Sequence, residues 1–282
     1  MTDQEQTRLL LACPDRPGLI AAVSGFLARA GLNITDADQH SSDGRLFMRM
    51  VFDSAPAGER DALYASFDAE IGRPLEMDYR FSQAGVRKRV AIMVSREDHC
   101  LTDLLWRWRA GELEAEITRV ISNHADHREH VEQLGVPYEL VEVSPDTKPN
   151  AETAALELLA GETDLLVLAR YMQVLSTEFL GRLGAPAINI HHSFLPAFVG
   201  ADPYARAHER GVKLVGATAH YVTEELDAGP IIDQDVTRVS HRDEVRDLVR
   251  IGRDAERMVL ARAVKAHLED RVLLDGVRTV VF

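Results

Sequence analysis

The hydrophobic pattern of the chain changes its period near residue 85, and this change constrains the fold more than any other feature. From Val90 onward, short apolar runs alternate with stretches of helical periodicity. We expect strands over 90–95, 117–122, 138–143 and 165–169, with helices over 101–109, 127–134 and 151–159 between them. Alternation of this kind is typical of a mostly parallel sheet covered by helices on both faces.

The residues before this change follow another order. Short strands over 7–12, 33–40, 46–52 and 76–81 are separated by two helical stretches, and Ser41-Ser42-Asp43-Gly44 is a hairpin signal. In the first helix, Leu19, Val23, Phe26 and Leu27 mark one buried face. The order βαββαβ predicts an antiparallel sheet with two helices on one face. We therefore expect one domain over 1–84 and another over 85–282, joined by a linker at 83–89 whose basic residues are solvated.

The composition limits the classes of partner. The chain has 282 residues and a formal net charge of −13, which argues against extended nucleic-acid binding because Lys and Arg must neutralise phosphates there. Two cysteines, Cys13 and Cys100, are too few for a disulfide framework and favour a reducing compartment. The polar N-terminus is not a signal peptide, and no apolar run reaches transmembrane length. We expect a cytoplasmic protein with no membrane partner.

Three polar residues stand at the ends of predicted elements. Asn189 and His191 close the apolar run 187–190 and, two residues apart on an extended chain, point to the same side. Ligands of parallel sheets bind beyond such strand ends. Asp227 lies in a loop, within the segment LDAGP at 226–230. Each residue alone has an ordinary structural explanation, but together an amide, an imidazole and a carboxylate are suited to polarising a carbonyl and moving a proton.

Two sets of motifs resemble known families. Asn189-Ile190-His191, Leu195-Pro196 and the LDAGP segment resemble the formyl-folate hydrolase and transferase family over about 90–282. Asp15-Arg16-Pro17-Gly18-Leu19 and the segment 31–34 resemble an ACT domain. An ACT-like domain ahead of this catalytic domain is similar to the formyltetrahydrofolate deformylase family. The resemblance implies an ACT-like regulatory or oligomerisation domain followed by a mostly parallel, Rossmann-like formyltransferase-type domain.

The resemblance also implies an activity. It is the hydrolysis of 10-formyltetrahydrofolate to formate and tetrahydrofolate, which feeds formate to purine biosynthesis and balances one-carbon folate pools. Asn189 and His191 would then donate to the oxyanion, His191 would supply a proton, and Asp227 would favour the imidazolium and orient water or act as its base. The assignment of base and acid between His191 and Asp227 stays open. No metal or other cofactor is expected, because His191 and His192 face opposite ways on a strand and no motif places a third ligand.

The expected ligand contacts come from the same resemblance. A slot for the flat pterin and its surroundings would be formed by Met172, Gln173, Val174, Leu175, His220 and Leu226. Residues 172–175 could equally pack as a helix start, and His220 could equally be a hydrogen-bonded core histidine. A small amino acid is the expected effector at Asp15, Gly18 and Asn33. The glycines of that region also have a purely structural explanation, with Gly18 as a helix entry and Gly31 as a helix stop. The ACT-like domain predicts a homo-oligomer.

Three other functions remain to be weighed. A formyl transfer to phosphoribosylglycinamide would use the same three residues, but the loop 95–100 lacks the glycines with which backbone amides wrap a phosphate. A methionyl-tRNA formyltransferase is disfavoured by the acidic chain and the domain order. A catalytically dead amino-acid sensor is disfavoured by the intact Asn189, His191 and Asp227. The chain departs from the deformylase pattern at Asp202, where a basic residue is usual, and at Ala205, where a histidine is usual.

Overall fold

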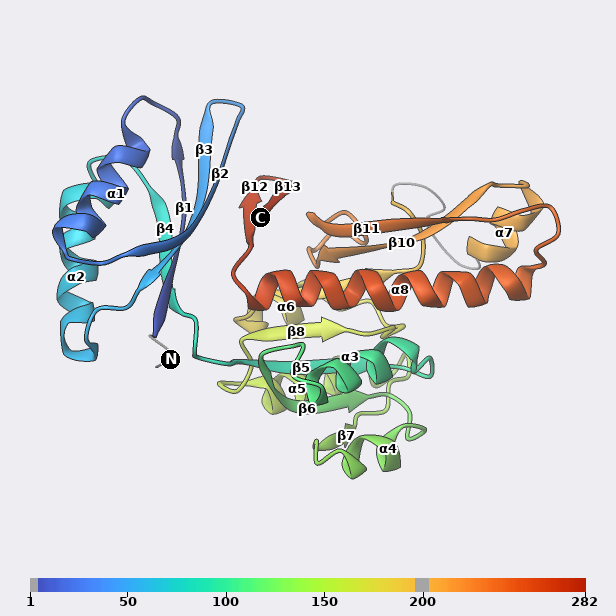
Figure 1. The fold of residues 1–282 in the computed structure, drawn as a ribbon. Coiled ribbons are helices and arrows are strands. Elements are labelled where there is room, and N and C mark those ends of the chain that lie inside the picture. The colour runs from blue at the N-terminus through green and yellow to red at the C-terminus, as the bar shows by residue number, and fades with distance from the viewer. Residues whose placement is uncertain (1–4, 196–202) are drawn as a thin grey trace. The chain divides into compact units, whose positions relative to one another are not determined.

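The computed structural model describes residues 5–195 and 203–282, and the chain divides into two compact units (Figure 1). One unit contains Met1–Arg87 together with Glu269–Phe282, and the other contains Lys88–Leu268. The expected division into 1–84 and 85–282 is therefore corrected at the C-terminus. The last residues of the chain return to the N-terminal unit.

The first unit has the predicted βαββαβ order. Its strands and helices are β1 (Gln6–Pro14), α1 (Leu19–Arg29), β2 (Ile34–Ser42), β3 (Arg45–Asp53), the 3-10 turn η1 (Ala57–Glu59), α2 (Arg60–Phe67), the π turn η2 (Asp68–Gly72) and β4 (Asp78–Gln83). The strands form an antiparallel sheet in the order β2-β3-β1-β4. At the β2–β3 turn Asp43 and Gly44 both have positive φ, of 51° and 75°, as a tight hairpin turn of the primed type requires.

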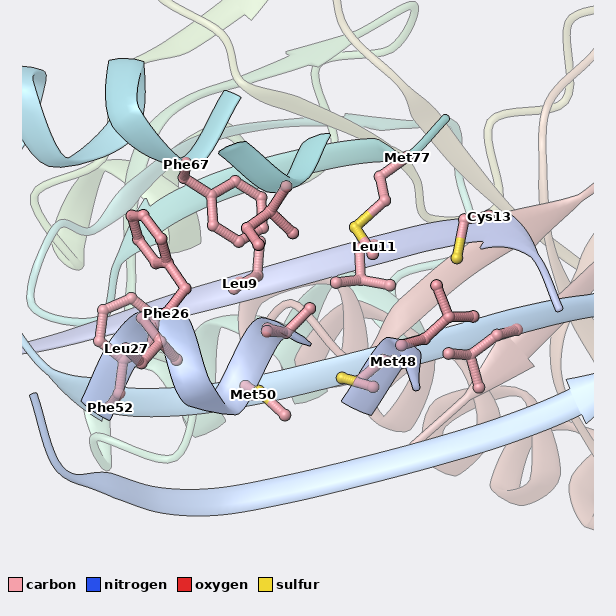
Figure 2. Close-up of a cluster of buried hydrophobic side chains, with 14 residues drawn as sticks. Leu9, Leu11, Cys13, Phe26, Leu27, Met48, Met50, Phe52, Phe67 and Met77 are labelled. Carbon is pink, nitrogen blue, oxygen red and sulfur yellow. The ribbon is translucent and has the colours of Figure 1, made fainter. Parts of the chain in front are cut away.

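The core of this unit lies between the sheet and its two helices (Figure 2). Leu9 and Leu11 of β1 share this core with Phe26 of α1 and Phe67 of α2, and the rings of Phe26 and Phe67 meet edge to face. All four residues predicted for the buried face of α1 are buried.

The other face of this sheet is covered by the end of the chain. Leu10 and Phe47 pack with Leu273 from the C-terminal hairpin, which is formed by β12 (Val272–Asp275) and β13 (Arg278–Val281). The segment is anchored by Asp270, whose side chain is 1% exposed and forms ion pairs with Arg8 and Arg80. This contact explains the corrected boundary, since the hairpin supplies apolar cover that the βαββαβ unit lacks on that face.

The second unit contains the predicted alternation of strands and helices. Its elements are β5 (Lys88–Val94), α3 (His99–Arg109), β6 (Ala115–Ser122), α4 (Arg128–Gln133), β7 (Tyr138–Leu140), α5 (Lys148–Leu159), β8 (Leu165–Leu168), α6 (Thr177–Leu183), β9 (Ala187–His191), α7 (Pro203–Glu209), β10 (Leu214–Tyr221), β11 (Ile231–Arg238) and α8 (Val245–Leu268). The sheet order is β11-β10-β9-β8-β5-β6-β7. The strands from β9 to β7 are parallel, whereas β10 and β11 run antiparallel to their neighbours. This mixed α/β fold confirms the predicted class.

Helices cover both faces of this sheet. On one face, α5 and α6 pack on Met93, Leu168 and Ala187 of three neighbouring strands. On the other, α3 contacts α8, and α8 contacts β9, β10 and β11 (Figure 1). Within the described residues, no helix has the length and apolar character needed to cross a membrane.

The expected linker at 83–89 is shorter than predicted, because its last two basic residues belong to a strand. Lys88 and Arg89 begin β5, two residues before the predicted start. Lys88 donates to the backbone oxygens of His267 and Leu268, and Arg89 forms an ion pair with Asp164. These contacts connect the first strand of the second unit to the end of α8 and to the loop before β8.

Candidate active site

A cavity of about 600 Å³ lies where the carboxyl ends of β8 and β9 meet the loop after β5. The loop after β10 and residues of α7 and α8 complete its lining. The predicted residues that line it are Asn189, His191, Asp227, Met172, Gln173, Val174, Leu175, His220 and Leu226. The position agrees with the rule that parallel sheets bind ligands beyond the carboxyl ends of their strands.

Asn189 and His220 face each other across paired strands. They are opposite in the β9–β10 register, and Asn189 Nδ2 lies 3.2 Å from His220 Nε2. His220 Nδ1 lies 2.9 Å from the backbone oxygen of Tyr221, which only accepts, so Nδ1 carries the hydrogen. When His220 is neutral, Nε2 accepts from Asn189, and when His220 is protonated, Nε2 carries a hydrogen that faces Asp227. The amide nitrogen of Asn189 has a second N–H that this contact does not use.

His191 is paired with Asp227. Its Nδ1 lies 3.1 Å from Asp227 Oδ2, while Oδ1 of the same carboxylate lies 3.6 Å from His220 Nε2. Burial alone would raise the pKa of Asp227, but hydrogen bonds and charge from His191 and His220 outweigh it and hold that pKa well below its usual value. Asp227 is therefore ionised and accepts from Nδ1 of His191. The opposite ring nitrogen, Nε2, is buried and has no hydrogen-bond partner among the described residues.

The loop that carries Asp227 has a constrained backbone. Asp227 has a φ of 55°, in the left-handed region that Asp tolerates better than most residues. Gly229 follows, and a Cβ at this position would overlap the backbone oxygen of Tyr221. The loop therefore approaches the end of β10 closely, and this approach sets the carboxylate against both imidazoles.

The residues proposed for the pterin slot precede a helix and do not start it. Helix α6 begins at Thr177 with Ser176 as its cap, so 172–175 are loop residues that lie beside the cavity. Met172, Val174 and Leu226 are 56%, 56% and 60% exposed, which is unusual for apolar side chains that line one cavity. Ser95, after β5, fixes this loop because its Oγ accepts from the backbone N–H of Met172 at 3.0 Å.

Sequence reasoning missed a second set of polar residues that line the same cavity. Glu256 on α8 is 1% exposed and binds His99 of α3, Tyr204 of α7 and Arg170 after β8. The sequence patterns predict no element over 245–268, and Glu256 is not among the predicted site residues. The signal was present, since Glu256 stands on the apolar face of a helical pattern that also contains Leu248, Val259 and Leu260.

The structure describes one of the two positions at which the chain departs from the deformylase pattern. Asp202 lies outside the described residues, whereas Ala205 is on α7 and lines the cavity. His192 also lines it, with its ring 6.2 Å from that of Tyr204. Burial, helped by the charge of Arg170, lowers the pKa of His192 to about 4, so this side chain is neutral near neutral pH.

One group of side chains has the composition of a metal site. The ligand atoms of His99, Cys100 and Glu256 lie within 4.8 Å of one another. However, the carboxylate of Glu256 already accepts from His99 and Tyr204, and the guanidinium of Arg170 lies 3.4 Å from it. Burial, with the nearby charge of Glu256, raises the pKa of the Cys100 thiol, which disfavours the thiolate that a metal needs. The group fits an ion-pair cluster better than a cation site.

The predicted effector residues are only partly brought together. Asp15 and Gly18 line a depression on the first unit, with Arg16, Gln39, His40 and Ser41. Asn33 is not among its lining residues, and its backbone oxygen accepts from Asp53.

Comparison with known proteins agrees with both units. Residues 88–264 match the formyl transferase family model, and residues 7–65 match the ACT domain model. The chain is 56% identical to the formyltetrahydrofolate deformylase of Mycobacterium tuberculosis H37Rv, over 98% of this chain and 90% of the relative.

Solved structures extend the comparison. A formyltetrahydrofolate deformylase from Pseudomonas syringae superposes with a TM-score of 0.95 at 50% identity, over 100% of this chain and 96% of that one. Glycinamide ribonucleotide transformylase 1 from Symbiobacterium toebii has a TM-score of 0.65 at 30% identity, over 70% of this chain and 94% of its own. Because the deformylases match both units over nearly their full length, the chain belongs to the formyltetrahydrofolate deformylase family.

Proposed function

We propose that this chain hydrolyses 10-formyltetrahydrofolate to formate and tetrahydrofolate. The observation that carries the proposal is the His191–Asp227 pair, in which Nε2 of His191 has no hydrogen-bond partner among the described residues and lies on the wall of the cavity with Asn189. A formamide presents a carbonyl that needs donors and a leaving nitrogen that needs a proton. These three residues supply both.

The reaction follows from their geometry. Water attacks the formyl carbon, and the carbonyl oxygen becomes an oxyanion that accepts from the amide of Asn189 and from protonated Nε2 of His191. The C–N10 bond then breaks, a proton is transferred to N10, and formic acid loses its remaining acidic proton to give formate. The negative charge of Asp227 favours the imidazolium of His191, and its carboxylate is also placed to orient the water or receive its proton.

Substrate binding uses the apolar side of the cavity. A flat pterin fits between Met172, Val174 and Leu226, whose exposed surfaces lose contact with water when it binds. Gln173 and Leu175 complete this wall, and backbone groups of the loop that Ser95 holds are available to the polar edge of the ring. We propose that the folate is the substrate and that no metal or further cofactor takes part.

The ACT unit has a regulatory role in the same proposal. A small amino acid would bind beside Asp15 and Gly18, with Arg16 available to its carboxylate. We also propose a homo-oligomer, which light scattering on the full chain tests. A monomeric mass at micromolar concentration would contradict it. A cytoplasmic location stays a prediction, and the two buried free cysteines are compatible with it.

The decisive experiment follows formate released from 10-formyltetrahydrofolate, with and without phosphoribosylglycinamide. We expect one formate per formyl group consumed in both conditions. Consumption that requires the amine, with the formyl group recovered on it, would assign a transferase instead. No consumption in either condition, by protein that binds the folate, would assign a catalytically inactive sensor.

A further inference from the structure

The cavity has two chemically different sides. The loops that carry Met172, Val174 and Leu226 form an apolar side, next to Asn189 and His191. The other side is formed by His99, Arg170, Tyr204 and Glu256, which we call the acceptor-side cluster. The proposed reaction uses none of these four residues.

The acceptor-side cluster is internally bonded around Glu256. Oε2 of Glu256 lies 2.8 Å from His99 Nε2 and 3.4 Å from Arg170 Nε, and the hydroxyl of Tyr204 donates to Oε1 at 2.7 Å. Burial would raise the pKa of Glu256, but its contacts with His99, Arg170 and Tyr204 outweigh this and lower it, so the carboxylate is ionised. The ring of Tyr204 lies over Gly252, where a Cβ would overlap it. The cluster therefore occupies space between α3, α7 and α8.

Both arginines on the described lining are paired. Arg170 forms an ion pair with Glu256, although its Nε has no hydrogen-bond partner among the described residues, and Arg253 forms an ion pair with Glu97 in the loop before α3. The described lining holds these two arginines against five carboxylates, namely Glu97, Glu224, Glu225, Asp227 and Glu256. On this described lining each guanidinium lies against a carboxylate, and the excess of carboxylates repels a dianion.

A related fold accepts a phosphorylated amine. The similar structure from Symbiobacterium toebii is that of a glycinamide ribonucleotide transformylase, and a phosphate monoester carries about −1.5 to −2 charges at pH 7. In a shared fold, the choice between water and such an acceptor must be made by residues that face the formyl group from outside the folate slot. The acceptor-side cluster lines the same cavity as Asn189 and His191 and is separate from the residues proposed for the slot.

We infer that the acceptor-side cluster and the Glu97–Arg253 pair exclude phosphorylated amines from this cavity and so leave water as the acceptor. The inference rests on the proposed hydrolysis and names the residues that determine its specificity. Glu256 and Glu97 are specificity residues in this sense, because they neutralise the two guanidinium groups that could otherwise bind a phosphate.

The test removes each neutralising charge with little change of shape. Glu256→Gln removes the carboxylate beside Arg170, and Glu97→Gln removes the carboxylate beside Arg253. The side chain of Glu97 is 38% exposed, so we expect the Glu97→Gln protein to fold. Asp164→Asn is the matched control, since it breaks the Arg89 ion pair of the same unit and Asp164 does not line the cavity. Binding of inorganic phosphate is measured by calorimetry, and inhibition of formate release is measured with phosphoribosylglycinamide and with unphosphorylated glycinamide.

We expect each glutamate variant to bind phosphate and phosphoribosylglycinamide about tenfold more tightly than the wild type, with glycinamide unaffected. The Asp164→Asn protein should behave as the wild type. Folded Glu97→Gln protein without this gain would overturn the inference, as would an equal gain for glycinamide or in the control. If the wild type releases no formate, the proposed hydrolysis fails, and the phosphate titrations still decide whether the paired charges exclude the anion.

Discussion

Replacing Asp227 by Asn tests the central pair of the site. The substitution keeps the shape of the side chain but removes the charge that lies 3.1 Å from Nδ1 of His191. Two unit charges at this separation attract by about 5 kcal/mol at an effective dielectric constant of ~20. If between half and all of this interaction stabilises the imidazolium in the transition state, hydrolysis slows by about 10²- to 10⁴-fold.

The assay separates chemistry from binding. Single-turnover formate release gives the rate of the chemical step, and equilibrium titration with the folate gives its affinity, which we expect to change less than about threefold because Asp227 is not part of the apolar slot. Asp233→Asn is the control, since it removes the same charge from a β11 residue that is paired with Arg262 and does not line the cavity. Turnover of the Asp227 variant within about threefold of the wild type would refute the role assigned to this pair.

Three further predictions concern neighbouring positions. Asn189→Ala should lower kcat by about 10²–10³-fold through loss of an oxyanion donor, with little change in folate affinity; an unchanged kcat would remove the amide from the mechanism. Gly229→Ala should push the loop away from the Tyr221 oxygen and destabilise the protein by about 1–3 kcal/mol in denaturant titrations, whereas Gly181→Ala, in open space on α6, should not destabilise it. His192 takes up its proton near 6.5 when unfolded and at about 4 when folded, so stability should fall as the pH drops through that window, by up to about 3 kcal/mol. The His192→Gln protein should show a flatter profile there, and an equally steep one would contradict the assigned burial.

The strand-helix order could be predicted because each element buries an apolar face with a clear period. The positions of Asn189 and His191 followed from the end of one apolar run, and Asp227 from a recognisable loop motif. Their contact with His220 depends on the register of β9 and β10, which no local pattern specifies. That register therefore decides which ring nitrogens of His191 and His220 are used in contacts within the site and which can bind a ligand.

Two features escaped prediction for physical reasons. Glu256 interrupts the apolar face of α8 with a charge, and its stabilising partners come from three other elements, so its role is visible only in three dimensions. The C-terminal hairpin is too short to carry a strong periodic signal, and its place is set by Leu273 and by the ion pairs of Asp270 with Arg8 and Arg80.

The return of residues 269–282 to the N-terminal unit has a consequence for synthesis. Most of the first unit is translated before the catalytic unit, but the hairpin that covers Leu10 and Phe47 is translated after it. Until the hairpin is synthesised, one face of the sheet of the first unit is exposed to water, and Arg8 and Arg80 lack the carboxylate of Asp270. The catalytic unit, a continuous segment from Lys88 to Leu268, thus emerges complete before the unit that precedes it in the sequence. A chain that stops early at Leu268 would keep its active-site residues and would lose the closure of the ACT unit.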